Sequence, residues 1–189
     1  MKVLGILGSP RKDGNTDILL DKVLSVAKAA GAKTEKIRLG NMKFSPCIEC
    51  CGCDKTGLCV LKDDLTPVYD KLKKADVIVV ASPIFFGSLS AQTKAMIDRC
   101  QAPWVGKYIL KKPMSKIKRP GIFLSAESSD RKDFFENAKS IIKNLFATID
   151  VKYSGEILVA NVEKKADIRK RKSVLEKAYK LGKKIVKEG

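Results

Sequence analysis

The sequence contains no histidine among its 189 residues. Histidine is the side chain whose ordinary pKa lies nearest to neutral pH, and it is the commonest metal ligand in proteins. Catalysis by a histidine acid or base, and metal binding through imidazole, are therefore excluded. Aromatic residues are also scarce, at 6% of the chain, whereas hydrophobic residues as a whole make up 44%. We expect a mainly aliphatic core of a size that suits one domain.

Long apolar runs are absent as well. A helix that crosses a bilayer needs about 20 consecutive apolar residues, and no stretch of this chain approaches that length. Residues 1–7 are apolar but shorter than the hydrophobic segment of a secretory signal, and they run directly into a loop at Gly8. We therefore expect a soluble cytoplasmic protein with no membrane partner.

Acidic residues are few relative to basic ones. The chain carries 38 Lys and Arg against 21 Asp and Glu, which gives a formal net charge of +17. Residues 107–119 hold six basic side chains and no acid, and residues 164–187 hold eleven against two acids. Such a surface attracts nucleic acid, anionic membranes or acidic proteins. A lysine-rich helix face that is simply solvated, with no binding role, explains the same charge at least as well. Nucleic acid is disfavoured as a partner, because the basic runs lack interleaved aromatics that stack on bases.

Cysteine, in contrast, is concentrated in one place. Five of the six cysteines fall within 13 residues: Cys47, Cys50, Cys51, Cys53 and Cys59. In a cytoplasmic protein such a cluster favours a soft metal or redox chemistry over disulfides. The sixth, Cys100, follows a helical pattern and is expected to be a small buried hydrophobe.

The spacing of the clustered cysteines is compatible with three kinds of site. A [4Fe–4S] cluster takes four thiolates, and the two-residue spacings favour Cys47, Cys50, Cys53 and Cys59 as its ligands, with Cys51 as a possible replacement for a neighbour. Zinc takes four thiolates too, but zinc sites usually separate two Cys-x2-Cys pairs by a longer segment. A metal-free thiol redox site is the third possibility. We favour the iron–sulfur cluster, with zinc as the main alternative.

Strand and helix patterns alternate five times along the chain. Strands are expected at residues 2–7, 33–39, 75–82, 121–124 and 153–159, and helices at 16–30, 63–74, 89–100, 131–149 and 164–187. This alternation predicts an α/β fold with a doubly wound, five-stranded parallel sheet in the flavodoxin-like order 2-1-3-4-5. A single domain is expected over residues 1–189, with the cysteine-rich loop inserted after strand 2 at residues 40–62. Ligands bind such sheets beyond the carboxyl ends of the strands, so the loops there are the informative ones.

The loop after the first strand has the composition of a phosphate site. It leads into a helix N-terminus, where backbone N–H groups and the helix dipole favour an anion. Ser9, Asn15 and Thr16 can donate hydrogen bonds to phosphate oxygens, and Arg11 can neutralise their charge. An ordinary turn is the alternative. Neither Gly-x-Gly-x-x-Gly nor the Walker pattern occurs, which disfavours a dinucleotide site and a P-loop.

The loops after the third and fourth strands can complete a pocket for a flat heteroaromatic ring. The first has two adjacent aromatics framed by Pro and Gly, and we expect at least one of these rings to pack under the loop. Its candidate residues are Pro83, Ile84, Phe85, Phe86 and Gly87. The second is small and polar, and its candidates are Ser125, Ala126 and Glu127.

These segments resemble a known family. The sequences GSPR at residues 8–11, GNT at 14–16 and SPIFFG at 82–87, with Lys94, Asp98 and Arg99 beyond, are similar to those of the NADPH-dependent FMN reductases, which are flavodoxin-like. With the cysteine motif added, the chain resembles the iron–sulfur flavoproteins of anaerobic archaea and bacteria as far as about residue 127. The resemblance implies that Ser9, Arg11, Asn15 and Thr16 hold the FMN phosphate and that residues 83–87 and 125–127 line its ring. It also implies a homo-oligomer, a dimer or tetramer, in which a cluster and a flavin from neighbouring subunits approach each other.

Three functions of different classes follow from these patterns. The first is an FMN and [4Fe–4S] redox protein between a one-electron carrier such as an acidic ferredoxin and a two-electron acceptor, with no side chain assigned as catalytic. The second is an NAD(P)H-dependent FMN or quinone reductase whose cysteines hold zinc. The third is a basic nucleic-acid-binding module that retains the fold.

Overall fold

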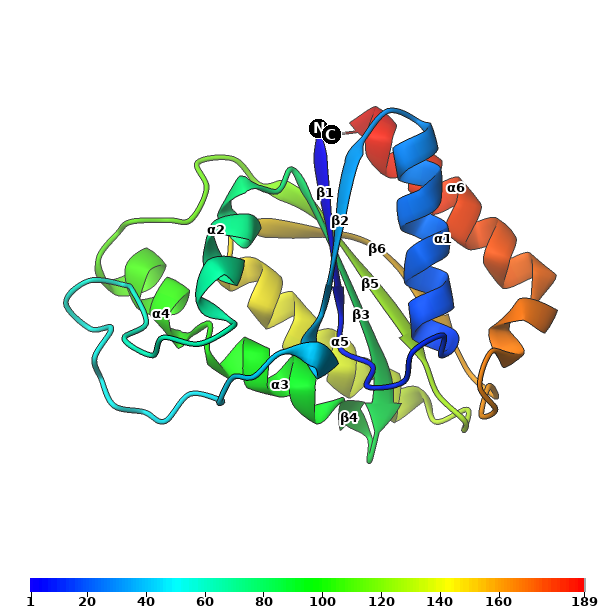
Figure 1. Cartoon of the computed structure of the whole chain (residues 1–189), viewed down its shortest axis with the longest axis horizontal. Helices are drawn as coiled ribbons and strands as arrows, with labels where there is room; N and C mark the ends of the chain where they lie inside the picture. The colour runs from blue at the N-terminus through cyan, green and yellow to red at the C-terminus, as the bar shows by residue number, and fades with distance from the viewer. Residues whose placement is uncertain (189) are drawn as a thin grey trace.

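A parallel β-sheet forms the centre of the molecule in the computed structural model, which describes residues 1–188 (Figure 1). Its strands are β1 (Lys2–Leu7), β2 (Lys33–Arg38), β3 (Val77–Phe85), β5 (Arg119–Ala126) and β6 (Val151–Val159). They lie in the order β2-β1-β3-β5-β6, and each neighbouring pair is parallel. The flavodoxin-like topology expected from the sequence is confirmed.

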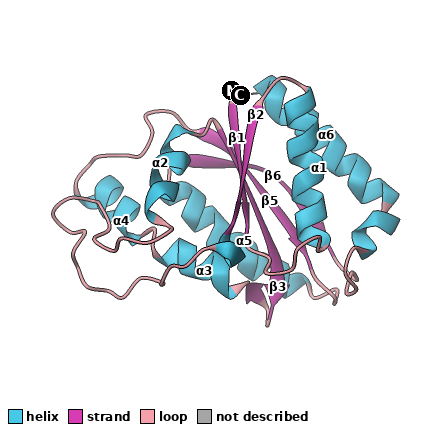
Figure 2. Ribbon diagram, viewed as in Figure 1, coloured by secondary structure: helices cyan, strands magenta, loops and turns pink. Residues whose placement is uncertain are grey.

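Helices cover both faces of this sheet, as Figure 2 shows. One layer contains α1 (Asn15–Ala29) and α6 (Lys172–Glu188), and the other contains α2 (Thr66–Lys74), α3 (Ala91–Asp98) and α5 (Lys132–Thr148). Successive residues of a strand face opposite layers, so Val77 and Val79 pack with α1 while Ile78 and Val80 pack on the other side. A strand buried on both faces needs an unbroken apolar run, and this is why residues 77–81 gave the clearest strand pattern.

The structure departs from the expected elements at three places. Strand β3 continues to Phe85 and turns back through a short strand, β4 (Ser88–Leu89), where a loop was expected. The chain after Cys100 forms α4 (Gln101–Trp104) and one π-helical turn, η2 (Val105–Ile109). The last helix begins at Lys172, eight residues later than expected, after the short 3-10 helix η3 (Asp167–Lys170).

The cysteine-rich loop lies beyond the carboxyl end of β2. It leaves the 3-10 helix η1 (Leu39–Asn41) and reaches α2 without forming a regular element, and it lies beside α4 at one end of the molecule (Figure 1). Within residues 1–188, none of the helices combines the length and the apolar character needed to cross a bilayer.

Candidate functional site

A cavity of about 220 Å³ lies at the carboxyl edge of the sheet, where the chain order reverses between β1 and β3. The loop after β1, the end of β3 and the loop after β5 converge on it. The predicted site residues that line it are Ser9, Arg11, Asn15, Thr16, Pro83, Ile84, Phe85, Ala126 and Glu127. Loops separated by more than 100 residues of sequence therefore meet at one site, as the parallel topology requires.

The loop after β1 is held in a tight turn around Ser9. The Ser9 hydroxyl is buried and accepts a hydrogen bond from the Arg11 N–H at 3.2 Å, and the Gly14 N–H donates to the Arg11 carbonyl at 3.2 Å. The N-terminus of α1 then faces the cavity, and the first N–H groups of a helix have no partner within that helix. A helix N-terminus of this kind can bind an anion, and the exposed side chain of Arg11 lies on the same loop.

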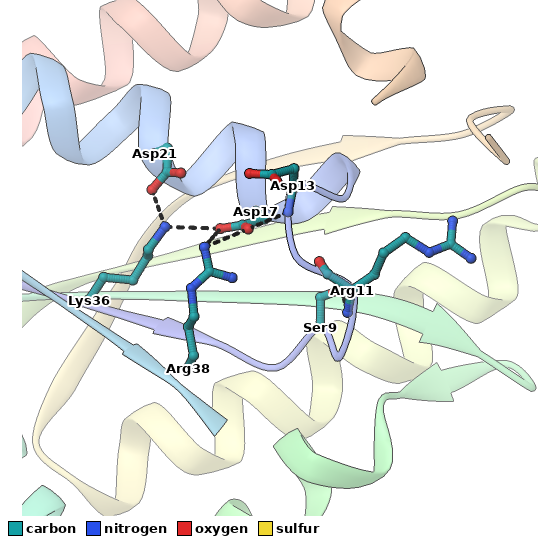
Figure 3. Close-up of polar contacts among 7 residues, drawn as sticks. All are labelled: Ser9, Arg11, Asp13, Asp17, Asp21, Lys36 and Arg38. Atoms are coloured by element: carbon teal, nitrogen blue, oxygen red, sulfur yellow. Dashed lines mark hydrogen bonds and ion pairs between the residues drawn. The ribbon is translucent and has the colours of Figure 1, made fainter. Parts of the chain in front are cut away.

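A buried carboxylate supports this loop from behind. Asp17 accepts the Asp13 N–H at 2.8 Å and pairs with Lys36 at 3.0 Å and Arg38 at 2.7 Å, both of which reach across from β2 (Figure 3). Burial by itself raises the pKa of Asp17, but the hydrogen bonds from Lys36, the Asp13 N–H and Arg38 outweigh burial and hold the pKa below its ordinary value. Asp17 was not among the predicted site residues. The sequence indicates only that a carboxylate lies in the first turn of a helix, which does not reveal its partners.

The side chain of Asn15 does not have the role predicted from the sequence, which was to donate hydrogen bonds to phosphate oxygens. Its side-chain amide donates to the carbonyls of Val162 and Lys164 at 3.2 and 3.1 Å and accepts the Ile168 N–H at 3.1 Å. These bonds use the polar atoms of the side chain to fasten the segment after β6 to the start of α1. The Asn15 side chain therefore ties two loops together, and the backbone of Asn15 and Thr16 is what the helix N-terminus offers to an anion.

The segment after β6 also lines the cavity, through Val162 and Glu163. The flavin-site candidates predicted from the sequence lie only in the loops after strands one, three and four. The rule that ligands bind beyond the carboxyl ends applies equally to the last strand and could have found these residues.

The aromatic residues at the end of β3 are both exposed. Phe86 and Gly87 have φ angles of 49° and 74°, and they form a two-residue hairpin between the paired residues Phe85 and Ser88. Alternation along the strand turns Ile84 inward and Phe85 outward, and Phe86 at the tip is fully exposed. The expectation that one ring packs under the loop is wrong, because these residues continue a strand. Phe86 and Gly87 lie outside the lining of the cavity.

The end of β5 contributes one buried acid. Ser125 is fully buried and donates to the Ser82 carbonyl at 2.8 Å, so its hydroxyl serves the sheet. Glu127 lines the cavity at 5% exposure, and its Oε1 has no hydrogen-bond partner among the described residues. Burial raises the pKa of Glu127. A buried carboxyl oxygen that lacks a partner fits a ligand with hydroxyl or N–H donors, such as the ribityl chain or the ring of a flavin.

A second cavity, of about 580 Å³, lies under the cysteine loop. Its walls come from that loop, from the junction of α3 and α4, and from α5. The clustered cysteines all line it: Cys47, Cys50, Cys51, Cys53 and Cys59. Within residues 1–188, no three Cys, Asp or Glu side chains lie close enough together to hold a metal ion. The donor set itself fits a soft metal, since several thiols share one cavity and lie on a loop without regular hydrogen bonding.

The thiols of this cavity are near enough to affect one another. Burial raises the pKa of the Cys53 thiol, and the charges of Asp54, Cys47 and Cys59 raise it further. A cation between the sulfurs would remove this repulsion. Cys100 also borders the cavity but behaves differently, because full burial raises its pKa to about 12 and its thiol donates to the Met96 carbonyl at 3.5 Å. Its prediction as a buried hydrophobe is confirmed.

The backbone of the cysteine loop is tightly curved. Glu49 and Cys51 both have positive φ angles, 55° and 57°, on either side of Cys50. Gly57, at φ 71°, lies against the π-helical turn so closely that a Cβ atom would come within 2.9 Å of the Gly106 Cα. Non-glycine residues in this conformation cost free energy and cluster at binding sites. The loop is thus a shaped element docked on η2.

Comparisons with known proteins identify the family of this chain. The model of the NADPH-dependent FMN reductase family matches residues 1–128. An iron–sulfur flavoprotein of Methanocaldococcus jannaschii is 42% identical over 106 residues, which cover 56% of this chain and 55% of the relative. One from Methanosarcina thermophila is 40% identical over 99 residues, 52% of each chain. The chain thus spans about half the length of the curated relatives it matches. The resemblance noted in the sequence is confirmed.

Solved structures show the same fold. An NAD(P)H:quinone oxidoreductase from Methanothermobacter marburgensis superposes with a TM-score of 0.73 at 16% identity, covering 98% of this chain and 96% of the other. A flavodoxin from the domain Archaea has a TM-score of 0.60 at 14% identity, with coverage of 100% and 98%.

Proposed function

This chain belongs to the NADPH-dependent FMN reductase family, and from that premise we propose that it is a redox protein with two cofactors, FMN and a [4Fe–4S] cluster. The observation that carries the proposal is the presence of two separate cavities on one chain. One lies at the switch point of the sheet and the other is lined by clustered thiols. When bound, the cofactors supply the chemistry, because a cluster exchanges single electrons and FMN exchanges one or two.

In this proposal the switch-point cavity holds the phosphate and ribityl parts of FMN. Ser9, Arg11 and the backbone at Asn15 and Thr16 bind the phosphate, and Glu127 accepts a hydrogen bond from the cofactor. Because the cavity of about 220 Å³ is small, the ring would lie partly outside it, against Pro83–Gly87 and Ala126, while the buried Ser125 would support this edge from within the sheet. The exposed ring of Phe85 gives it an apolar wall.

The second cofactor is proposed to take its four thiolates from Cys47, Cys50, Cys53 and Cys59. Cys51 is left out because Cys47, Cys50 and Cys53 follow one another at the two-residue spacing that recurs in cluster loops. The cysteine loop lacks regular secondary structure, so its thiols can draw together around a cluster.

Electrons are proposed to pass between a one-electron carrier, such as an acidic ferredoxin, and a two-electron acceptor. The net charge of +17 supports an acidic carrier, because opposite charges steer such encounters. A homo-oligomer is proposed as well, since large exposed hydrophobics lie beside both cavities: Phe85 and Phe86 at the first, and Ile48, Val60 and Trp104 at the second. We place the protein in the cytoplasm, where clustered thiols remain reduced.

The direct test is the composition of protein purified without oxygen. We expect one FMN and about four iron and four sulfide per chain, with a broad visible absorbance beneath the flavin bands. In the cofactor-loaded protein, the cluster and the flavin should accept electrons from reduced ferredoxin. Protein that contains flavin and zinc, but no sulfide, would overturn the proposal.

A second candidate is an NAD(P)H-dependent FMN or quinone reductase with zinc in the cysteine loop. The family name and a 29% identical relative, a putative NAD(P)H-dependent FMN-containing oxidoreductase of Bacillus subtilis, favour it. Rapid oxidation of NAD(P)H by the zinc-containing protein would establish it. The nucleic-acid-binding module finds no support in these comparisons, and a salt-dependent affinity for DNA in flavin-free protein would be needed to revive it.

A further inference from the structure

The cavity under the cysteine loop contains one fully buried cation. Arg99 follows the last turn of α3 and is 1% exposed, although arginine is rarely buried unless it is paired. Its backbone carbonyl accepts a hydrogen bond from the Tyr69 hydroxyl of α2 at 2.8 Å. Both the charge and the main chain of this residue are thus held in place.

The partners of the Arg99 guanidinium lie at the two ends of the cysteine loop. Nη1 donates to the Ser45 carbonyl at 3.0 Å, two residues before Cys47, and to the Asp63 carboxylate at 2.6 Å, four residues after Cys59. Nη2 donates to the other oxygen of Asp63 at 3.3 Å. The planar guanidinium of Arg99 therefore joins the segment that enters the cysteine loop to the segment that leaves it. A lysine, with its single charged nitrogen, cannot reproduce this arrangement.

The remaining donor of the guanidinium has no protein partner. Arg99 Nε is buried and makes no hydrogen bond within the part of the chain that the structure describes. Arg99 lines the same cavity as the cysteines. Arg119 is a useful contrast. Its Nε also lacks a partner, but it binds the last carbonyls of α2 and α5 and does not line this cavity.

We propose that Arg99 is a positioning residue for the cysteine site: its Nη atoms close the neck of the loop, and its Nε–H is the donor for the anionic thiolate–metal group that occupies the cavity. The second half rests on the proposed function. An unpartnered N–H donor on a residue that lines a cavity of thiols suits this role, because hydrogen bonds to cluster sulfurs and thiolates tune cluster potentials.

The expected effect on the cofactor has a definite sign. Reduction adds negative charge to the cluster, so a fixed cation and an N–H donor stabilise the reduced form more than the oxidised form. Loss of the Nε donor should therefore make the midpoint potential of the cluster more negative and leave that of the flavin unchanged.

The test compares wild-type protein with Arg99→Lys, which keeps the charge but loses the fork and Nε. We expect the amides of residues 45–63 to exchange with solvent about tenfold faster in the variant. We also expect a loss of metal affinity on the order of 10- to 100-fold against a chelator, together with a more negative cluster potential. Arg119→Lys is the matched control, and it should destabilise the fold without moving any of these values.

The proposal is overturned if Arg99→Lys shows wild-type loop exchange, iron retention and potential. Should Arg99→Lys fail to fold, the double variant Arg99→Met with Asp63→Asn removes both charges of the pair and tests the same changes. If wild-type protein binds no iron and sulfide, the proposed function fails and the role of Nε fails with it. Loop exchange in the metal-free protein then still decides whether Arg99 closes the neck.

Discussion

Single side chains determine how closely the loops approach at the carboxyl edge of the sheet. Beneath the first loop lies a buried set of hydroxyls: the Ser90 hydroxyl donates to the Gly8 carbonyl at 2.7 Å and contacts the Thr93 hydroxyl at 2.8 Å. Above it, Asp17 fixes the backbone of Asp13. The turn that offers N–H groups to an anion is thus held from both sides by polar contacts that no local pattern reveals.

Replacement of Gly8 should be costly. A Cβ atom at this position would lie 1.7 Å from the Thr93 Oγ1, a distance that requires the loop or α3 to shift. We expect Gly8→Ala to lower the free energy of unfolding by about 1–3 kcal/mol and to weaken FMN binding, as measured by urea unfolding and flavin titration. Gly8→Ala combined with Thr93→Ala should recover part of both losses. A wild-type unfolding midpoint for Gly8→Ala alone would contradict this account.

The buried carboxylate of Asp17 leads to a prediction about how the stability of the fold depends on pH. Its pKa is lower in the folded protein than in the unfolded chain, so its contribution to stability is present above the unfolded value of about 3.9 and is lost as the pH falls through the folded value. Asp17→Asn should lower the free energy of unfolding at pH 7 by about 1.5–3 kcal/mol. Below about pH 4, the free energy of unfolding should also decrease less steeply with falling pH in Asp17→Asn than in the wild type.

Urea unfolding of both proteins between neutral and acidic pH measures this difference. Asp21→Asn is the control, because Asp21 also pairs with Lys36 but is about half exposed. Equal slopes for wild type and Asp17→Asn in acid would show that Asp17 is not the group involved.

At the scale of elements, the hairpin at the end of β3 is the least ordinary piece of the fold. Two-residue turns with positive φ at both positions favour Asn-Gly, whereas this chain has Phe86-Gly87. An aromatic ring is thus kept, fully exposed, at a strained position beside the cavity. Such strain is retained where the side chain serves binding.

Phe86→Asn separates stability from binding. Asn tolerates the left-handed conformation, so the variant should gain on the order of 0.5–1 kcal/mol in the free energy of unfolding of the flavin-free protein. If Phe86 contacts the flavin ring or a second subunit, the same variant should bind FMN or self-associate more weakly. Flavin titration and sedimentation measure the two effects. An unchanged affinity and oligomeric state would leave the exposed ring without a binding role.

The cysteine loop is the second element that yields a prediction, because its cysteines are proposed to differ in whether they bind the cluster. Cys53→Ser should lose iron and sulfide while keeping FMN, because the two cavities have separate linings. Cys51→Ser should keep both cofactors, since Cys51 is outside the proposed ligand set. Iron, sulfide and flavin analysis of the two variants distinguishes them, and loss of iron from Cys51→Ser instead would make Cys51 the ligand.

At the scale of the whole molecule, the basic charge is unevenly distributed. Residues 107–119 begin in η2, which lies against the cysteine loop at Gly57. Residues 164–187 include η3 and most of α6, which packs with α1 on one face of the sheet (Figure 1). If an acidic carrier delivers electrons to the cysteine site, only the first set should affect the rate.

We therefore expect Lys112→Glu with Lys116→Glu to slow electron transfer from reduced ferredoxin by about tenfold at low salt. Lys177→Glu with Lys180→Glu changes the net charge equally on exposed residues of α6 and should have little effect. Stopped-flow measurements at rising ionic strength check both. A rate that does not fall with salt would exclude electrostatic docking.

The sequence by itself determined the sheet, its strand order and the two groups of candidate residues, because these follow from short-range patterns. Hydrophobic period distinguishes strand from helix, and alternation along the chain dictates the parallel topology. The cysteine spacing and the loop after β1 needed no further context. The extension of β3 through Phe85 could not be predicted, since the hairpin needs a positive φ angle at Phe86, against local preference, and is fixed by the pairing of Phe85 with Ser88 of β4.

Only the tertiary structure decided which polar groups meet. Asn15 and Ile168, Asp17 and Arg38, and Arg99 and Asp63 are pairs from distant parts of the chain. Burial makes each pairing obligatory, because a polar group removed from water must find a partner. Those contacts assign Asn15 to a structural role and leave Glu127 Oε1 and Arg99 Nε without a hydrogen-bond partner among the described residues.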